Sequence, residues 1–239
     1  MSRPSTYVLV HGAWHGGWCW RRVADRLSGA GHRVFCPTLT GLGERAHLLT
    51  PAVNLDTHVQ DVVGVLDAEE LENAVLVGHS YAGLVISGVA ACALRHLRRL
   101  VYLDALLVED GQSWADAFPP QVTEARRKSA TVTKGVKTLP APDPKIYGFS
   151  DPADDAWLRR RLTPHPFAPF EQKLQWGCPL GNGLPKVYVD CSQPALAALA
   201  AMKARWRAGA DWEFIELQTG HDLMVSAPEQ TAQILLRYA

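Results

Sequence analysis

A serine flanked by small residues forms a pattern that could hold a nucleophile. Ser80 lies in the stretch from Val75 to Gly83 (V-L-V-G-H-S-Y-A-G), between an apolar run and a second apolar segment. A strand that turns sharply into a helix needs small side chains two positions before and two after such a serine, and Gly78 and Ala82 meet that need. A serine that merely caps a helix has no such need. The pattern predicts that Ser80 is a nucleophile on a tight turn, with a helix beginning at the serine.

A serine nucleophile needs a base to accept its proton, and His221 has the most suitable position. It stands in Thr219-Gly220-His221-Asp222, directly after the last apolar run that is typical of a strand. The other eight histidines have no comparable placement. Because a histidine base must be neutral, we expect activity to fall at acid pH.

His11 and His15 have a spacing that also occurs in metal sites. No third candidate ligand clusters with them, and a metal ion needs at least three protein ligands. The sequence therefore predicts neither a metal ion nor another cofactor.

Strands and helices must alternate to bring Ser80 and His221 together, and the apolar pattern indicates such an alternation. The expected strands are Tyr7–Val10, Val34–Cys36, Ala74–Val77, Leu100–Leu103, Val187–Val189 and Trp212–Leu217. The expected helices are Leu55–Leu71, the helix from Ser80, Ala195–Ala208 and a closing helix after Pro228. This order favours a mostly parallel sheet covered by helices on both faces.

The rhythm breaks between residues 107 and 185, where Pro-rich stretches mix with short amphipathic pieces. We interpret residues 107–185 as a cap inserted into a core that comprises residues 1–106 and 186–239. Trp114, Phe118, Trp157, Phe167, Phe170 and Trp176 give this segment its apolar bulk. Small-molecule pockets are mostly apolar, so we expect the cap to contribute to substrate selectivity.

The balance of charged residues indicates which kinds of molecule the protein binds. The chain has 239 residues, with 24 basic and 24 acidic side chains and a formal net charge of +0. This balance argues against nucleic-acid or anionic-membrane partners and favours a small molecule. We find no signal-peptide pattern and no apolar run long enough for a membrane span, so a cytoplasmic location is expected. The five cysteines are scattered without a C-x-x-C pair, which argues against disulfides.

Three segments together resemble a known family: Val8 to Trp20 (V-L-V-H-G-A-W-H-G-G-W-C-W), Gly78 to Gly83, and Gly220-His221. They are similar to the α/β-hydrolase family of plant methyl salicylate esterases and hydroxynitrile lyases, especially its bacterial esterase members. The resemblance implies an α/β-hydrolase fold, a mostly parallel central sheet flanked by helices with an inserted helical cap. It further implies that Ser80 is the nucleophile, His221 the base, and the backbone N–H groups of Ala13 and Tyr81 the oxyanion-hole donors. The resemblance alone suggests a homodimer.

The acid that should orient His221 departs from the family pattern, because Pro194 stands where the plant relatives have an aspartate. Asp104 follows the strand next to the nucleophile strand, an alternative acid position in this fold, and we favour it. Asp190 is the alternative, although the alternation of side chains along its strand leaves its direction open. Asp222 is adjacent to His221 in sequence and poorly placed to reach its ring.

These observations predict a serine carboxylesterase that hydrolyses small, aromatic or hydrophobic esters through an acyl-enzyme. Hydroxynitrile lyase is one alternative, but the lyases have a threonine and a lysine where this chain has Gly12 and Asp222. A non-catalytic ligand-binding protein on the same fold is the other alternative.

Overall fold

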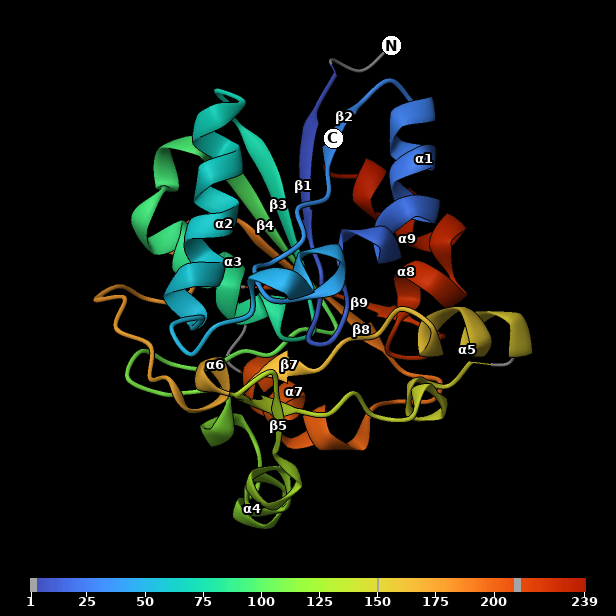
Figure 1. Cartoon of the computed structure of the whole chain (residues 1–239). Coiled ribbons are helices and arrows are strands. Elements are labelled where there is room, and N and C mark those ends of the chain that lie inside the picture. Colours follow the sequence, from blue (N-terminus) through green and yellow to red (C-terminus); the bar gives the residue numbers. More distant parts are fainter. Residues whose placement is uncertain (1–3, 150, 209–211) are drawn as a thin grey trace.

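The computed structural model describes residues 4–149, 151–208 and 212–239. Within these residues, six strands form one sheet in which every neighbouring pair is parallel (Figure 1). Their order across the sheet is β2 (Arg33–Phe35), β1 (Thr6–Val10), β3 (Ala74–His79), β4 (Leu97–Leu103), β8 (Lys186–Cys191) and β9 (Glu213–Leu217). The parallel sheet that the sequence predicts is therefore confirmed.

Helices cover both faces of this sheet, which is why its central strands are apolar on both sides. One face packs against α2 (Leu55–Ala68) and α3 (Ala82–Cys92). The other packs against α1 (Arg21–Gly29), α8 (Leu223–Ser226) and α9 (Pro228–Leu236), as Figure 1 shows. All six residues of β3 are buried, so the strand that leads to Ser80 is held firmly between two core clusters.

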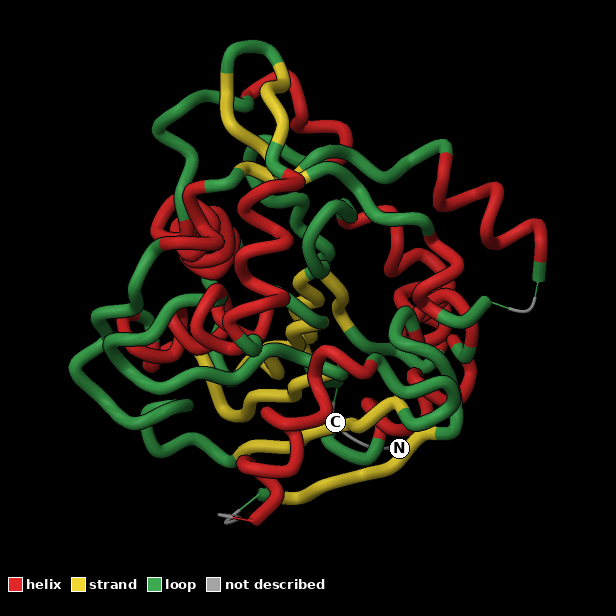
Figure 2. The backbone as a smooth tube through the Cα atoms, turned by 90° about the horizontal axis from the view of Figure 1, so that it is seen from below, coloured by secondary structure: helices red, strands yellow, loops and turns green. Residues whose placement is uncertain are grey.

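Much of the described part of residues 107–185 lies beyond the carboxyl ends of the strands, where Figure 2 shows many loops, and the chain then returns to the amino end of β8. The segment contains α4 (Pro120–Ser129), α5 (Pro152–Arg159) and α6 (Ala168–Glu171). It also contains a small antiparallel sheet of β5 (Thr131–Thr133), β6 (Val136–Leu139) and β7 (His165–Pro166). The expected helices of the insertion are thus joined by a small sheet that the sequence does not indicate, because strands of two to four residues are too short to leave an alternating pattern.

Two further boundaries differ from the expectation. The helix after the nucleophile motif begins at Ala82 and not at Ser80, because the positive φ of Ser80 (+53°) is not helical. The helix expected over residues 195–208 is α7 (Ala200–Ala208), preceded by a single 3-10 turn. Among the helices of the described residues, none has both the length and the apolar character needed to cross a bilayer.

Arg98 ties the first and last parts of the described chain together at the amino ends of the strands. Its guanidinium donates one hydrogen bond to the hydroxyl of Ser5 (3.0 Å) and one to the carbonyl of Tyr238 (2.8 Å). Ser5 directly precedes β1, and Arg98 is the second residue of β4. Ser5 and Tyr238 therefore lie at the edge of the sheet opposite Ser80.

Candidate active site

Ser80 sits on the turn between β3 and α3 with a φ of +53°, in the left-handed region that side chains other than glycine rarely adopt. The turn is crowded. A Cβ atom on Gly78 would lie 2.8 Å from the carbonyl oxygen of Ala82, and one on Gly83 would lie 2.1 Å from that of Leu106. Both glycines are thus required by close backbone contacts, and the strained turn presents the half-buried Ser80 at the end of the strand.

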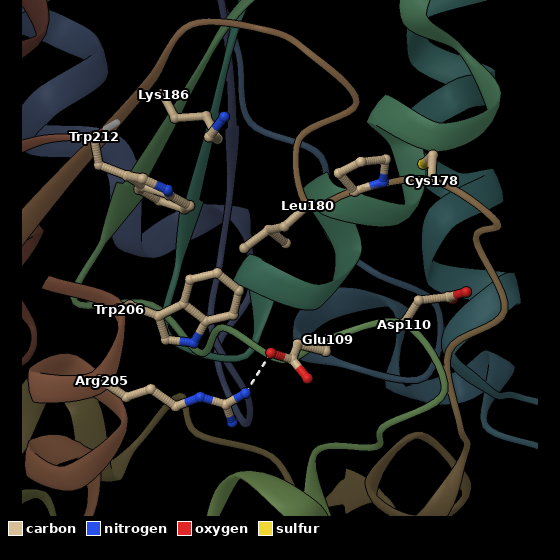
Figure 3. Close-up of a pocket in the computed structure, with 9 residues that line it drawn as sticks. Glu109, Asp110, Cys178, Leu180, Lys186, Arg205, Trp206 and Trp212 are labelled. Atoms are coloured by element: carbon tan, nitrogen blue, oxygen red, sulfur yellow. Dashed lines mark hydrogen bonds and ion pairs between the residues drawn. The ribbon is translucent and has the colours of Figure 1, made fainter. Parts of the chain in front are cut away.

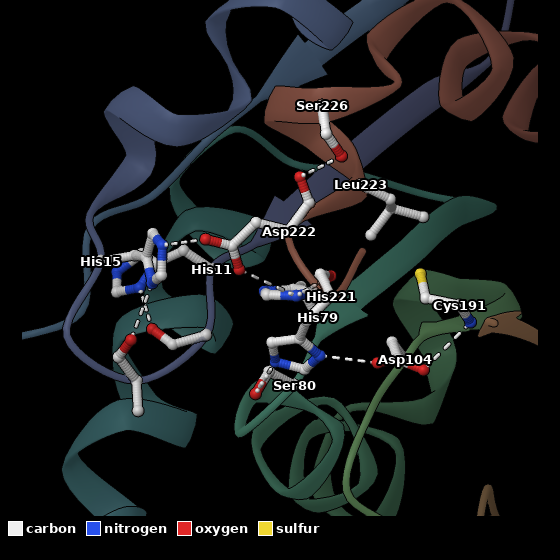
Figure 4. A network of polar contacts seen from close by, with 12 residues as sticks. His11, His15, His79, Ser80, Asp104, Cys191, His221, Asp222, Leu223 and Ser226 are labelled. Atoms are coloured by element: carbon white, nitrogen blue, oxygen red, sulfur yellow. Dashed lines mark hydrogen bonds and ion pairs between the residues drawn. The ribbon is translucent and has the colours of Figure 1, made fainter. Parts of the chain in front are cut away.

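Ser80, His221 and Asp104 form one hydrogen-bonded chain (Figure 4). Nε2 of His221 lies 2.9 Å from Oγ of Ser80, and Nδ1 lies 2.6 Å from Oδ2 of Asp104. An ionised carboxylate accepts only, so Nδ1 carries the proton and Nε2 is free to accept one from the serine. The structure thus brings together the three side chains that the sequence singles out as nucleophile, base and favoured acid.

Asp104 occupies the carboxyl end of β4, beside the nucleophile strand, and is fully buried. Its second oxygen, Oδ1, accepts a hydrogen bond from the backbone N–H of Cys191 (3.1 Å). The same oxygen forms an ion pair with the ammonium group of Lys203. Burial alone would raise the pKa of Asp104. The hydrogen bond from His221, together with the charges of His221 and Lys203, outweighs burial and holds that pKa below its usual value.

Asp190, the alternative acid, points elsewhere. Its carboxylate accepts hydrogen bonds from Lys203 (2.7 Å) and from Arg207 (2.5 Å), and its contacts do not include His221. Lys203 is buried and bridges Asp104 and Asp190. Burial would lower the pKa of this lysine, but the two carboxylates raise it. No motif in the sequence singles out Lys203, which lies on a predicted helix among other basic residues.

The expected oxyanion donors flank Ser80. Among the described residues, the backbone N–H groups of Ala13 and Tyr81 have no acceptor, so both remain able to bind a ligand oxygen. Gly12 lets the loop after β1 approach Ser80 closely. A Cβ atom on Gly12 would lie 2.9 Å from Cβ of Ser80 and 2.8 Å from Nδ1 of His79. Nδ1 of His11 donates to the carbonyl of Gly12 (2.8 Å). The peptide whose N–H belongs to Ala13 is thereby fixed.

His11 and His15, the pair with a metal-like spacing, each have other partners. Nε2 of His11 accepts the backbone N–H of Leu39 (3.0 Å), so this buried ring is neutral, and burial lowers its pKa to about 3. Nε2 of His15 contacts Oδ2 of Asp222 (3.0 Å), while Nδ1 contacts the carbonyl of Ala13 (2.8 Å). Both nitrogens of His15 face acceptors, which favours the imidazolium form.

Asp222 is fully buried behind His221 and forms an ion pair with His15. Burial would raise the pKa of Asp222, but the charge of His15 keeps it low, and Asp222 in turn raises the pKa of His15 against the effect of burial. Nε2 of His79 donates to the carbonyl of His221 (3.0 Å). Ligand atoms of His79, His221 and Asp222 lie within 4.8 Å of one another, the only such grouping in the described residues. Both nitrogens of His221 are already hydrogen-bonded, whereas Nδ1 of His79 and Oδ1 of Asp222 have no hydrogen-bond partner there.

A hollow of about 390 Å³ opens onto Ser80 and His221. Most of its lining is apolar, and it includes Trp14, Trp114, Phe118, Leu106, Leu139, Pro140, Ile146 and Leu199. Tyr147 stacks on His221, with ring centroids 5.5 Å apart. Of the six aromatic residues expected to give the insertion its bulk, only Trp114 and Phe118 line this hollow among the described residues.

A second, larger hollow of about 600 Å³ includes neither Ser80 nor His221 in its lining. Figure 3 shows the residues that line it. It is bordered by Trp206 and Trp212 on one side and by Glu109 and Asp110 on another. Glu109 pairs with Arg205, and Asp110 accepts the backbone N–H of Trp176 (2.6 Å). Its acidic groups are therefore engaged in local contacts, whereas Ser80 and His221 line the smaller hollow.

A parallel sheet whose carboxyl edge carries a serine on a strained turn, within hydrogen-bond distance of a histidine, places the protein in the class of α/β hydrolases. The chain belongs to the alpha/beta hydrolase family, whose model matches residues 7–234. This finding confirms the fold and the family resemblance that the sequence indicates.

The chain is similar to known proteins over nearly its whole length. It is 39% identical over 241 residues to the "Carbendazim hydrolyzing esterase" of Nocardioides sp. (strain SG-4G), covering 97% of this chain and 98% of the relative. It is 26% identical to "Methylesterase 18" of Arabidopsis thaliana, covering 98% and 96%. A solved structure described as an extracellular alpha/beta-hydrolase from a Paenibacillus species superposes with a TM-score of 0.83 at 24% identity, covering 98% of each chain.

Proposed function

We propose that the protein is a serine carboxylesterase that hydrolyses small, aromatic or hydrophobic esters through an acyl-enzyme. One observation carries this proposal: Oγ of Ser80 lies 2.9 Å from Nε2 of His221, whose other nitrogen is bound to Asp104. The apolar hollow at Ser80 suits a hydrophobic acyl or alcohol group. The 39% identity to a protein named as a carbendazim-hydrolysing esterase supports an ester-cleaving activity.

In the proposed reaction, Ser80 transfers its proton to Nε2 of His221 and attacks the ester carbonyl. The N–H groups of Ala13 and Tyr81 donate to the oxyanion that forms, a contribution of roughly 3 to 4 kcal/mol for each donor. The tetrahedral intermediate collapses, and the alcohol leaves with the proton from His221. Water, deprotonated by His221, then attacks the acyl-enzyme and releases the acid. Every step uses side chains and backbone groups of this chain.

Asp104 is the proposed triad acid. It keeps the proton of His221 on Nδ1, so that Nε2 faces the serine, and it stabilises the imidazolium that forms during attack. Losing such an acid costs on the order of 10³- to 10⁴-fold in kcat. Asp190 has no such role in this proposal, because its carboxylate binds Lys203 and Arg207.

We assign residues 107–185 to a cap over a core of residues 1–106 and 186–239. The hollow supports this division, since Trp114, Phe118 and Arg126 from the segment line it together with Ser80 and His221. In this arrangement the core supplies the reacting groups and the cap supplies much of the wall that selects the substrate.

The spacing at Gly12 favours the esterase over a hydroxynitrile lyase. A side chain at this position would collide with Ser80 and His79, so the threonine that the resemblance associates with lyases has no room here. Cyanide release from mandelonitrile without cleavage of 4-nitrophenyl esters would nevertheless select the lyase.

Mass spectrometry of a fluorophosphonate adduct tests the proposal. The wild-type protein should gain one adduct on Ser80, and Ser80→Ala should gain none. Asp104→Asn and Asp190→Asn form a matched pair, since each removes one charge from a contact of Lys203. Labelling should slow by orders of magnitude in Asp104→Asn only.

Two outcomes would overturn the proposal. An unlabelled wild-type protein that also fails to cleave 4-nitrophenyl acetate and carbendazim would indicate a ligand-binding protein. Slowed labelling in Asp190→Asn, with normal labelling in Asp104→Asn, would transfer the acid role to Asp190.

A further inference from the structure

The positively charged side chain of Arg126 lines the mostly apolar hollow at Ser80. It belongs to the last turn of α4 and lines the same hollow as Ser80 and His221. Its guanidinium carbon lies 4.4 Å from the ring centroid of Phe118 and 5.3 Å from that of Trp114. Two aromatic rings therefore hold the cation in place, at a wall that is otherwise largely apolar.

The guanidinium has no acidic partner among the described residues. Nη1 of Arg126 is buried and makes no hydrogen bond, and none of the ion pairs of the described chain involves this residue. The next two cations of the same helix differ, because Arg127 pairs with Glu171 (2.8 Å) and Lys128 approaches Glu124 (3.9 Å). Of these three cations, Arg126 alone lacks a carboxylate partner among the described residues, and it lines the hollow.

Arg126 remains charged in this setting. Burial lowers the pKa of its guanidinium to about 10, which still lies well above neutral pH. A half-buried cation whose buried Nη1 has no hydrogen-bond partner is unfavourable, and cation–π contacts return only part of the lost hydration. An anionic group that entered the hollow would supply the missing partner. The planar fork of a guanidinium fits the two oxygens of a carboxylate in particular.

We propose that Arg126 determines specificity for esters that carry a second, anionic oxygen group, such as a free carboxylate, at a distance from the scissile bond. This inference rests on the proposed esterase function and narrows its substrate class. The apolar walls take the body of such a molecule, Ser80 receives the ester carbonyl, and Arg126 pairs with the anion.

Two matched substrate pairs test this inference, one for each side of the ester. Mono-4-nitrophenyl adipate against 4-nitrophenyl hexanoate places the charge on the acyl side. 4-Acetoxybenzoate against 4-tolyl acetate places it on the alcohol side. In at least one pair, the wild-type protein should prefer the anionic ester in kcat/KM, and Arg126→Met should lower that preference about tenfold or more, the value of one charged hydrogen bond.

Arg127→Met is the matched control, since it removes a neighbouring cation of the same helix that pairs with Glu171 outside the hollow. It should leave the preference within about twofold, as expected for an exposed ion pair. Arg126→Lys keeps the charge without the fork and should give an intermediate preference. The loss in Arg126→Met should also shrink at high salt, because charge pairing is screened.

The outcomes separate this inference from the esterase proposal. Cleavage of the neutral esters without a preference for either anionic ester would overturn the role of Arg126 and leave the esterase intact. An equal fall of both rates in Arg126→Met would mean that the side chain only supports Trp114 and Phe118. Absence of any cleavage, together with absence of the Ser80 adduct, would instead overturn the esterase.

Discussion

Lys203 contacts the carboxylate of Asp104 on the oxygen that faces away from His221. The same ammonium lies 2.7 Å from Asp190, so one buried cation holds both carboxylates that the sequence offers as acids. Its contact with Asp104 fixes the orientation of that side chain. Its charge also offsets part of the negative field that Asp104 exerts on His221. Lys203 is thus a positioning residue for the proposed triad.

Lys203→Met should move the acid limb of the kcat/KM profile to higher pH, by roughly one unit, because a positive charge beside the hydrogen-bonded pair of Asp104 and His221 is removed. The rate at the optimum should fall as well, since Asp104 loses one of its orienting contacts. A pH–rate profile with a 4-nitrophenyl ester measures both effects.

Arg207→Met provides the comparison for Lys203→Met. Arg207 also pairs with Asp190, but its described contacts do not include Asp104. This variant should leave the acid limb in place. A shift of equal size in both variants would show that general surface charge, and not the contact with Asp104, sets the profile.

Gly12→Ala should reduce kcat/KM by about 100-fold or more. The added Cβ would lie 2.9 Å from that of Ser80 and 2.8 Å from Nδ1 of His79, so the loop or the serine must move. Misplacement of reacting groups by about 1 Å has effects of this size. Steady-state kinetics measure the loss, and circular dichroism verifies the fold.

Gly64→Ala is the counterpart of Gly12→Ala, because Gly64 lies in α2 and an added Cβ meets nothing within 4 Å. It should keep full activity and stabilise the protein by about 0.5 to 1 kcal/mol through helix propensity. Full activity of Gly12→Ala would mean that the first loop does not form the oxyanion hole.

The buried histidines should make the protein labile to acid. Burial lowers the pKa of His11 and His79 to about 3 and that of His58 to about 4, and it lowers the pKa of His165 well below its usual value. In the unfolded chain these rings titrate near ~6.5, so between roughly pH 4 and 6.5 the unfolded state binds more protons. Stability is therefore lost as the pH falls through this range.

Calorimetry across pH measures this loss. At pH 5.5, unfolding should take up about three to four protons, which corresponds to a slope on the order of 4 kcal/mol per pH unit in the free energy of unfolding. His15 contributes little at that pH, because its raised pKa leaves it protonated in both states. A melting temperature that stays constant between pH 7 and 5 would contradict the assignment of neutral rings.

His165→Phe should raise the free energy of unfolding by about 1 to 2 kcal/mol at pH 7, because both ring nitrogens of His165 are buried without a partner among the described residues. The ring packs edge-on against Tyr81, with centroids 4.7 Å apart, a geometry that phenylalanine preserves. Proton uptake on unfolding at pH 5.5 should also fall by about one. Lower stability together with unchanged uptake would argue against this account.

The sequence predicts the sheet and the neighbours of Ser80 because these follow from local patterns and one geometric rule. Buried parallel strands are continuous apolar runs, and their carboxyl ends meet at one edge, so the sequence alone predicts that Asp104 lies near Ser80. The departure at Pro194 also pointed to Asp104. The structure brings Asp104 to His221 and leaves Asp190 with Lys203.

Other parts of the site depend on contacts that no local pattern encodes. His15 and Asp222 are 207 positions apart and become partners only when the first loop meets the last turn. Arg126 and Arg127 look alike in the sequence, and only the packing of α4 decides that one enters the hollow while the other meets Glu171. Strands as short as β5 and β7 were missed for lack of a measurable period.

The bridge that Arg98 makes between Ser5 and Tyr238 has a practical consequence for handling the molecule. A tag or a solid support joined to the chain beyond Ser5 or Tyr238 would start from the side of the sheet opposite Ser80 and leave the hollow accessible. Because Ser5 and Tyr238 are neighbours, a short peptide could also join them, and a circularly permuted chain opened at an exposed turn would keep every strand of the sheet.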